Sequence, residues 1–303
     1  MLTRSIKRVL KKIKPLREIG WWVETNVLSQ IEKKHDINII AKEKSDRRKG
    51  KQPSQNDSAL IALKGIKHGE TCIIVGNGPS LRISDLEAIY DSGMDSFGLN
   101  KINQLYAKTK WRPTYFVVHD HRFLISGEST IDIEKYIGDI QDEKTEIVFL
   151  RRQLGKIFPP NLNKKILYFR MPLKNAHQTD PTPIKGDISL QLEDLGSVTC
   201  AAIEIAMYMG YDKIYLYGQD FAYKKYIDID GNYVDADDLG TYADGIQERE
   251  EKYKKDYHDL RKTFKGFKEC KRYAEQIDVE IMNATRGGNL NLFSRVDFDD
   301  VIK

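Results

Sequence analysis

Residues 71–81 read TCIIVGNGPSL, an apolar run of five residues followed by a short stretch rich in glycine. Such a run, ending in glycines and followed by a helical pattern that here begins around Ser84, is typical of a buried parallel strand entering a tight strand-to-helix turn. Glycines let the backbone approach a phosphate, and the N-terminus of the next helix offers free N–H groups to an anion. The alternative interpretation is a tight turn that binds nothing.

The same stretch excludes two common phosphate-binding motifs. A P-loop requires Gly-Lys-Ser/Thr, which does not follow here. The dinucleotide fingerprint requires a third glycine, and Leu81 stands at that position. The pattern therefore predicts a nucleotide- or phosphate-binding turn of neither standard type.

Further strands and helices alternate along the rest of the chain. The apolar runs that predict strands lie at 96–99, 115–118, 146–150, 166–169, 213–217 and 279–282. Helical spacing covers 197–209, which Gly210 closes, and a long charged stretch at 246–276. This alternation predicts an α/β fold, a Rossmann-like and mostly parallel sheet with flanking helices.

Polar residues follow the ends of these predicted strands. In a parallel sheet ligands bind at the carboxyl ends of the strands, near a topological switch point. We therefore predict a nucleotide-binding site made by Gly76, Asn77, Gly78, Ser80, Asn100, His119, Asp120, Gln219, Asp220 and Arg286. Arginine suits this role because its guanidinium binds phosphate with two hydrogen bonds. The pair His119 and His121 lacks an evident third ligand, so we expect no metal site.

The segment 223–245 reads as an insertion after a strand end. Asp230-Gly-Asn232 between two short apolar runs predicts a hairpin turn. A calcium loop is excluded because Gly231 comes too early and no glutamate follows at the twelfth position. We expect this hairpin to act as a lid over the site.

Composition and charge divide the chain into three parts. The 303 residues carry a net charge of +4, yet residues 1–60 hold 15 Lys and Arg against 7 Asp and Glu, a net of +8. We expect a basic amphipathic helical extension at 1–40, a flexible linker at 41–58, where no apolar periodicity exists, and the α/β domain at 59–303. This composition excludes a fibre, a coiled coil and a disordered chain.

The basic extension suggests where the protein acts. Residues 1–23 combine seven Lys and Arg with an apolar stripe and the pair Trp21-Trp22, which favours binding to an anionic membrane surface. The alternative is a helix that packs on its own domain or on a second subunit of a homo-oligomer. No run of 18 apolar residues is present, and three distant cysteines suit a reducing cytosol. We expect a cytoplasmic protein, peripheral at the inner face of the cytoplasmic membrane, with no nucleic-acid partner.

Three stretches carry a resemblance to known families. One bacterial and archaeal family is similar to this chain in residues 76–81, 196–221 and 283–301. The family includes the archaeal 6-hydroxymethylpterin diphosphokinase, and its bacterial members often belong to surface-polysaccharide gene sets. The first two stretches also resemble the sialyltransferases of glycosyltransferase family 42. That resemblance, over roughly residues 65–300, implies a Rossmann-like nucleotide domain and a CMP-linked donor with no metal.

The sialyltransferase resemblance assigns roles to individual residues. It implies that Ser197 and Thr199 contact the nucleotide, as do the loop residues and Asn100. It implies that Tyr223 and Tyr226 hold the leaving phosphate, although their spacing departs from the family pattern. It also implies that His258 is the general base, because His258 lies at about the family's distance before the last strand, in a segment that is otherwise dissimilar. The family has an asparagine after the third strand, where His119 and Asp120 stand here, which leaves the base of the nucleotide open.

The resulting hypothesis is a glycosyltransferase-like enzyme of bacterial surface polysaccharide synthesis. It would transfer a sugar, favouring an acidic sugar from a CMP donor, to a glycan or lipid-linked glycan acceptor without a cofactor. The first alternative is a pterin diphosphokinase-like pyrophosphoryl transferase, in which Asp120 and Asp220 would bind Mg²⁺. The second is a non-enzymatic, nucleotide-binding scaffold of polysaccharide assembly.

Overall fold

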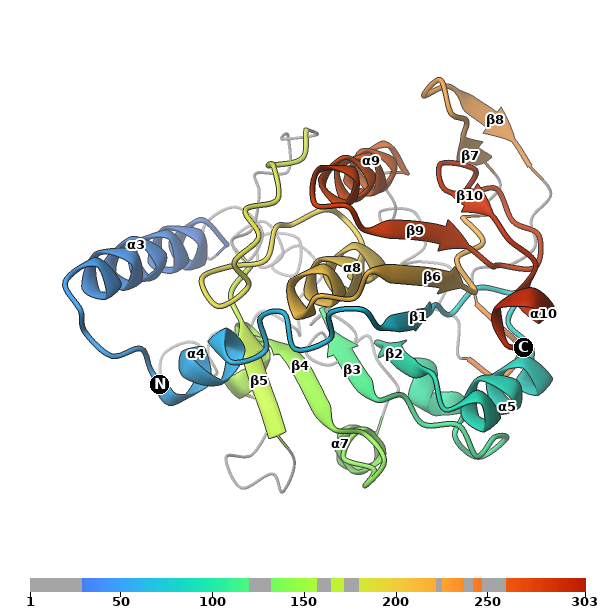
Figure 1. Ribbon diagram of the computed structural model, residues 1–303, viewed down its shortest axis with the longest axis horizontal. Helices are drawn as coiled ribbons and strands as arrows, with labels where there is room; N and C mark the ends of the chain where they lie inside the picture. Colours follow the sequence, from blue (N-terminus) through green and yellow to red (C-terminus); the bar gives the residue numbers. More distant parts are fainter. Residues whose placement is uncertain are drawn as a thin grey trace, which may run out of the picture.

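The structure of the protein is a computed structural model. It describes residues 29–119, 132–156, 165–171, 180–221, 225–236, 242–246 and 260–303. Its centre is an eight-stranded sheet in which every described pair of neighbouring strands is parallel (Figure 1). In their order across the sheet the strands are β10 Ser294–Arg295, β9 Glu280–Asn283, β6 Lys213–Tyr217, β1 Thr71–Val75, β2 Asp95–Leu99, β3 Tyr115–Val118, β4 Ile147–Arg151 and β5 Lys165–Phe169. The predicted α/β class is confirmed.

Helices cover both faces of this sheet. The described helices are α3 Ser29–Arg48, α4 Gln55–Ile61, α5 Ile83–Ser92, α7 Ile133–Ile140, α8 Val198–Met209, α9 Leu260–Gln276 and α10 Phe298–Val301, with 3-10 turns at Ile102–Leu105 and Arg152–Lys156. Apolar side chains of α4, α8 and α9 pack on one face, and those of α5, α7 and α10 pack on the other. Because both faces are covered, β1 and β3 can be almost wholly apolar.

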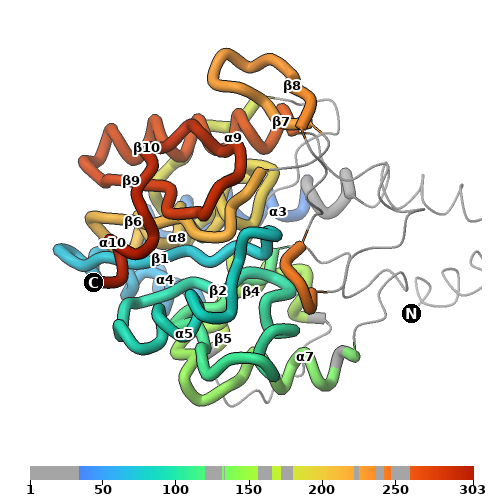
Figure 2. The backbone as a smooth tube through the Cα atoms, turned by 90° about the vertical axis from the view of Figure 1, so that its right-hand side faces the viewer, coloured from blue at the N-terminus to red at the C-terminus, as the bar shows by residue number. Residues whose placement is uncertain are grey.

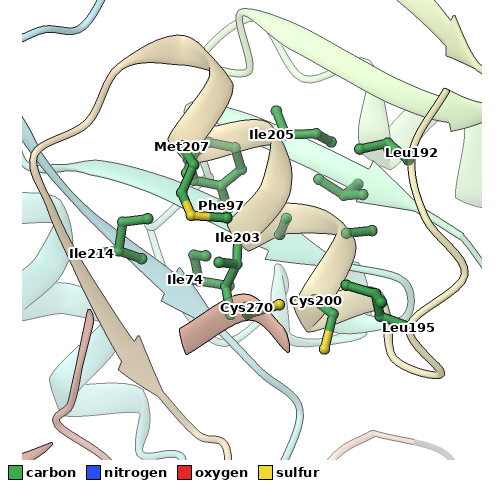
Figure 3. Close-up of a cluster of buried hydrophobic side chains, with 14 of the residues drawn as sticks. Ile74, Phe97, Leu192, Leu195, Cys200, Ile203, Ile205, Met207, Ile214 and Cys270 are labelled. Atoms are coloured by element: carbon green, nitrogen blue, oxygen red, sulfur yellow. The ribbon is translucent and has the colours of Figure 1, made fainter. Parts of the chain in front are cut away.

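Helix α8 is the centre of the larger apolar cluster (Figure 3). Its residues Cys200, Ile203 and Ile205 are fully buried, as are Ile74 of β1 and Phe97 of β2. The helix begins at the cap that Ser197 provides and ends at Gly210, which adopts a left-handed conformation. The helix and its closing glycine are as the sequence predicts.

The order in which successive strands are added to the sheet reverses at β1 and β6, which lie side by side. The strands β1 to β5 follow one another toward one edge, whereas β6 returns to the other side of β1 and β9 continues outward from it. The carboxyl ends of β1 and β6 therefore flank the topological switch point, where open α/β sheets bind their ligands. Figure 2 shows the molecule from the side at which β1 and β6 end.

The hairpin predicted around Asp230 is confirmed. Strands β7 Lys225–Ile227 and β8 Tyr233–Asp235 pair antiparallel, and the amide N of Asn232 donates to Asp228 Oδ1 at 2.8 Å across the turn. Figure 1 shows the hairpin at the side of the molecule where β6 and β9 end. Residues 223–224 and 237–241 of the insertion lie outside the described residues, and the lid role remains a prediction.

Two expectations about helices need correction. Residues 41–48 belong to α3 and residues 55–58 to α4, so of the expected linker at 41–58 only residues 49–54 lie outside these two helices. Helix α3 is held by polar contacts, among them Arg47 with Ser189 at 2.8 Å, which apolar periodicity does not detect. The charged helix expected at 246–276 is described from Leu260 onward, and residue 246 lies in a turn.

The expected extension at 1–40 is described only from residue 29, where α3 begins, and the membrane-binding segment 1–23 lies outside the described residues. Within the described part of the chain, no helix is both long and apolar enough to cross a membrane.

Candidate functional site

The loop 76–80 after β1 packs directly on the loop after β6. The amide N of Gly78 donates to the carbonyl O of Gly218 at 3.0 Å. A Cβ atom on Gly78 would lie 1.9 Å from Asp220 Oδ2, and one on Gly76 would lie 2.3 Å from Gln219 Nε2. Contact between the two loops is therefore a physical reason for both glycines, in addition to the phosphate approach and the tight turn that the sequence suggested.

Asp220 braces these loops from a buried position. Its carboxylate accepts hydrogen bonds from Ser80 Oγ at 2.8 Å and from the Ser80 amide N at 3.2 Å. Burial raises the pKa of Asp220 above its ordinary value, against the lowering effect of the two bonds from Ser80. The carbonyl O of Asp220 accepts from the Asn289 amide N at 2.6 Å, which joins the loop after β9 to the same assembly.

Asn77 and Asn100 lie at the ends of neighbouring strands. Asn77 Nδ2 donates to the carbonyl O of Leu99 at 3.1 Å, which ties the loop after β1 to the end of β2. Asn100 has a left-handed backbone, with φ of 46°, and its Oδ1 accepts from the His119 amide N at 3.2 Å. The structure thus brings together three of the predicted strand-end residues, with Asn77 Oδ1 buried and without a partner among the described residues.

The segment 242–246 covers part of this edge. The amide N of Ala243 donates to the carbonyl O of Asn77 at 2.8 Å, and Ala243 and Ile246 are buried. Figure 2 shows this short segment in orange across the end of the sheet. Sequence reasoning placed it in the charged helix or the lid and did not foresee its contact with the loop.

Gln219 joins the start of α8 to the switch point. Its side-chain Oε1 accepts a hydrogen bond from Thr199 Oγ1 at 2.9 Å, and its backbone N donates to Thr285 Oγ1 at 3.0 Å. Gln219 Nε2 is buried and has no partner among the described residues. The hydroxyl of Ser197, which was predicted to contact a nucleotide, accepts from the Thr199 amide N at 3.2 Å as the cap of α8.

A buried charge cluster near His119 was missed by sequence reasoning. Asp194 is almost fully buried and pairs with Lys262 Nζ at 3.0 Å. Burial raises the pKa of Asp194, but the charges of Lys262, His119 and Arg151 outweigh burial and lower it to about 2. No local pattern could reveal the cluster, because its members come from four separate segments of the chain.

Arg286 is engaged by carboxylates on the α5 and α10 side of the sheet. Its Nε donates to Asp85 Oδ2 at 2.7 Å, its Nη2 contacts Asp299, and its guanidinium lies 5.0 Å from the centre of the Phe298 ring. Two carboxylates therefore already bind the guanidinium of Arg286, which the sequence had predicted to contact a nucleotide.

The proposed catalytic residues are placed only in part. Tyr226 lies on β7, partly buried against the apolar cluster around α8 and α9. Tyr223, His258 and Asp120 lie outside the described residues. Among the residues that the structure does describe, no three His, Cys, Asp or Glu side chains are grouped so as to hold a metal ion.

Comparisons with known proteins were made at the levels of sequence and of structure. No protein family model matches the sequence, and no curated protein matches it. Among the solved structures with a similar backbone fold are two glycosyltransferases. One is the MAf glycosyltransferase from Magnetospirillum magneticum AMB-1, with a TM-score of 0.47, 12% identity, and coverage of 80% of this chain and 38% of that one. This chain thus spans little more than a third of that enzyme's length.

The second is the sialyltransferase CstII from Campylobacter jejuni, solved in complex with the substrate analogue cytidine-5'-monophosphate. Its TM-score is 0.43 with 15% identity, and the match covers 76% of this chain and 85% of that one. Similarity at this level assigns no activity to this chain.

Proposed function

We propose that the protein is a glycosyltransferase-like enzyme that binds a nucleotide-activated sugar at the switch point between β1 and β6. A CMP-linked acidic sugar is the favoured donor, and a glycan or lipid-linked glycan is the acceptor. The nucleotide part of the proposal rests on the fold and on the unpaired polar atoms described next. The sugar part rests on the resemblance of the sequence to glycosyltransferase family 42.

One observation carries the binding site. The ends of β1 and β6 each hold a buried polar atom without a partner in the described residues, the acceptor Asn77 Oδ1 and the donor Gln219 Nε2. Buried polar groups in native proteins almost always have a hydrogen-bond partner, in the protein, in water or in a ligand. Both atoms are shielded from solvent, so we propose that the side chains of Asn77 and Gln219 turn toward the nucleotide and hydrogen-bond it when it crosses the switch point.

The proposed reaction is an in-line displacement at the anomeric carbon of the donor. His258 takes the proton of the acceptor hydroxyl as that oxygen attacks, and the bond to the departing phosphate breaks. Tyr223 and Tyr226 donate hydrogen bonds to the phosphate as its charge develops. These roles come from the resemblance and are proposals for this chain.

A binding screen tests the site. We expect CMP to raise the melting temperature of the full chain more than CDP, UDP, GDP or ATP, with and without Mg²⁺. Gln219→Leu should weaken CMP binding by about tenfold or more, because it removes the unpaired donor and leaves a ligand acceptor unsatisfied. Gln141→Leu is the matched control, since Gln141 lies at the end of α7 and its Nε2 bonds only the Ile137 carbonyl O at 3.0 Å. Equal CMP affinity in the two variants would contradict the proposed site.

A turnover assay tests the reaction. His258→Ala should lower kcat by about 10²–10⁴-fold with little change in CMP affinity. His68→Ala is the control, because His68 is exposed and pairs with Asp212. Loss of turnover in EDTA with rescue by Mg²⁺ would favour the diphosphokinase alternative, and tight CMP binding without any transfer would favour a non-enzymatic scaffold.

A further inference from the structure

A pocket that neither Asn77 nor Gln219 lines is present at the start of α5. It has a volume of about 350 Å³ and is lined by residues from three separate segments. Among these are Arg82, Arg286, Arg295, Gly287, Asp297 and Phe298. Phe298 packs in the apolar cluster on the α5 face of the sheet, whereas α8, which carries Thr199, packs on the opposite face.

Three guanidinium groups line this pocket, and only one of them is neutralised by direct ion pairs. Arg286 is held by Asp85 and Asp299, as described above. Arg295 donates to the uncharged backbone carbonyls of Thr285, at 2.9 Å, and of Gly287. Burial lowers the pKa of Arg295, against the effect of the Asp220 charge, so an anion beside it would be favourable.

Arg82 supplies the second guanidinium without a direct carboxylate partner. Its backbone N donates to Tyr217 Oη at 3.2 Å, but within the described chain its exposed side chain has no hydrogen bond or ion pair. The lining carboxylate, Asp297, accepts from the Asp299 amide N at 2.9 Å as the cap of α10. Asp85 and Asp299 act on the pocket from outside its lining, both by pairing with Arg286 and, for Asp299, through the charge of Arg82. Among the lining side chains themselves, three are cationic and Asp297 is anionic, and neither Arg82 nor Arg295 has a direct carboxylate contact among the described residues.

We propose that this pocket binds a phosphate dianion, either free or as the phosphate group of a small ester. Guanidinium groups present paired donors that match phosphate oxygens. The volume is at the low end of the range for small-molecule pockets and exceeds the space that one phosphate fills, which leaves room for an attached group. The pocket adjoins the proposed nucleotide site, because the lining residue Thr285 accepts a hydrogen bond from the backbone N of Gln219 at 3.0 Å. The proposal does not require a nucleotide there, because neither Asn77 nor Gln219 lines the pocket.

Calorimetric titration of the full chain with inorganic phosphate and with ribose 5-phosphate, at constant ionic strength, tests the proposal. Arg82→Ala should weaken binding of both probes by about tenfold or more, because a charge-assisted hydrogen bond is lost. Arg48→Ala, the same change of charge at the exposed end of α3, should leave binding unchanged. The more conservative Arg295→Lys keeps the charge and should weaken binding less than Arg82→Ala.

The two probes also distinguish the source of the phosphate. Tighter binding of ribose 5-phosphate identifies an ester as the ligand, and equal binding identifies free phosphate. The proposal fails if neither probe gives saturable binding, or if Arg82→Ala and Arg48→Ala bind the probes with equal affinity. Because no nucleotide sugar is used, these outcomes are independent of whether the CMP experiments succeed.

Discussion

At Gly78 the space for a side chain is taken by the carboxylate of Asp220. A methyl group there would lie 1.9 Å from Asp220 Oδ2, so the loops after β1 and β6 would have to separate. We expect Gly78→Ala to lower the free energy of unfolding by about 1–3 kcal/mol, as overpacking does. Urea denaturation measures this change.

Gly138 provides the control for that experiment. It lies inside α7, and a Cβ atom on it would meet nothing within 4 Å. Gly138→Ala should therefore stabilise the protein by about 0.5–1 kcal/mol through helix propensity. If Gly78→Ala is as stable as the unchanged protein, the inference that the loops after β1 and β6 leave no space for a side chain at residue 78 is wrong.

The ion pair of Asp194 and Lys262 makes stability depend on pH in a defined window. The pKa of Asp194 falls from an unfolded value of 3.8 to about 2 in the fold, so the folded state binds fewer protons between these values. The stabilisation that the ionised Asp194 adds to the folded state is complete above pH 3.8 and is lost as the pH falls to about 2. Lys262→Met should cost on the order of 2 kcal/mol at pH 7 and progressively less below pH 4.

Lys265→Met is the matched control on the same helix. Lys265 pairs at 2.6 Å with Asp180, whose side chain is 82% exposed, so solvent screens the pair. Its loss should change stability little at either pH. Chemical denaturation at pH 7 and near pH 3 distinguishes the two variants, and equal losses at both pH values for Lys262→Met would contradict the assignment.

Among the elements, α3 shows how polar contacts can hold a helix that apolar periodicity does not reveal. Arg47 bonds Ser189 Oγ at 2.8 Å, and Asp36 accepts from Gln153 Nε2 at 2.9 Å. Because residues 41–48 are helical, brief trypsin treatment should cut after Lys49 or Lys51, between α3 and α4, before it cuts after Lys42. Mass spectrometry of the first fragments locates the cuts.

A variant at the contact tests why α3 is protected. Arg47→Ala removes the bonds to Ser189, so cleavage after Lys42 should become faster. Lys44→Ala keeps those contacts and serves as the control. Early cleavage after Lys42 in the unchanged protein would instead support the linker that the sequence suggested.

For the whole molecule, residues 1–23 are predicted to bind an anionic membrane surface. Each of the seven Lys and Arg between Arg4 and Arg17 can contribute about 1 kcal/mol near an anionic leaflet. The full chain should float with anionic vesicles at low salt and be released at high salt, because salt screens the attraction.

A chain lacking residues 1–28 keeps α3 and is the appropriate truncation. It should stay with the soluble fraction in vesicle flotation and should bind CMP as the full chain does. If the full chain ignores anionic vesicles and the truncation changes the oligomeric state instead, the extension is an assembly element.

The sequence alone determined the strands β1 to β6 and β9, the helix α8 and the hairpin, but not the short edge strand β10. Each of these is encoded locally: a run such as 71–75 is apolar enough to need burial on both faces, and Gly210 or Asp230-Gly-Asn232 marks where the chain must turn. The sequence also predicted the edge where site residues gather, because parallel strands all end on one side.

Only the tertiary structure decided which of these residues meet. Asp220 braces Ser80, Arg286 pairs with Asp85 on the α5 side, and Asp194 takes its charge partners from distant segments. The pocket of Arg82, Arg286 and Arg295 likewise joins three segments that no local pattern connects. Contacts of this kind depend on how loops pack once the sheet has formed, so the spacing of residues along the chain carries no information about them.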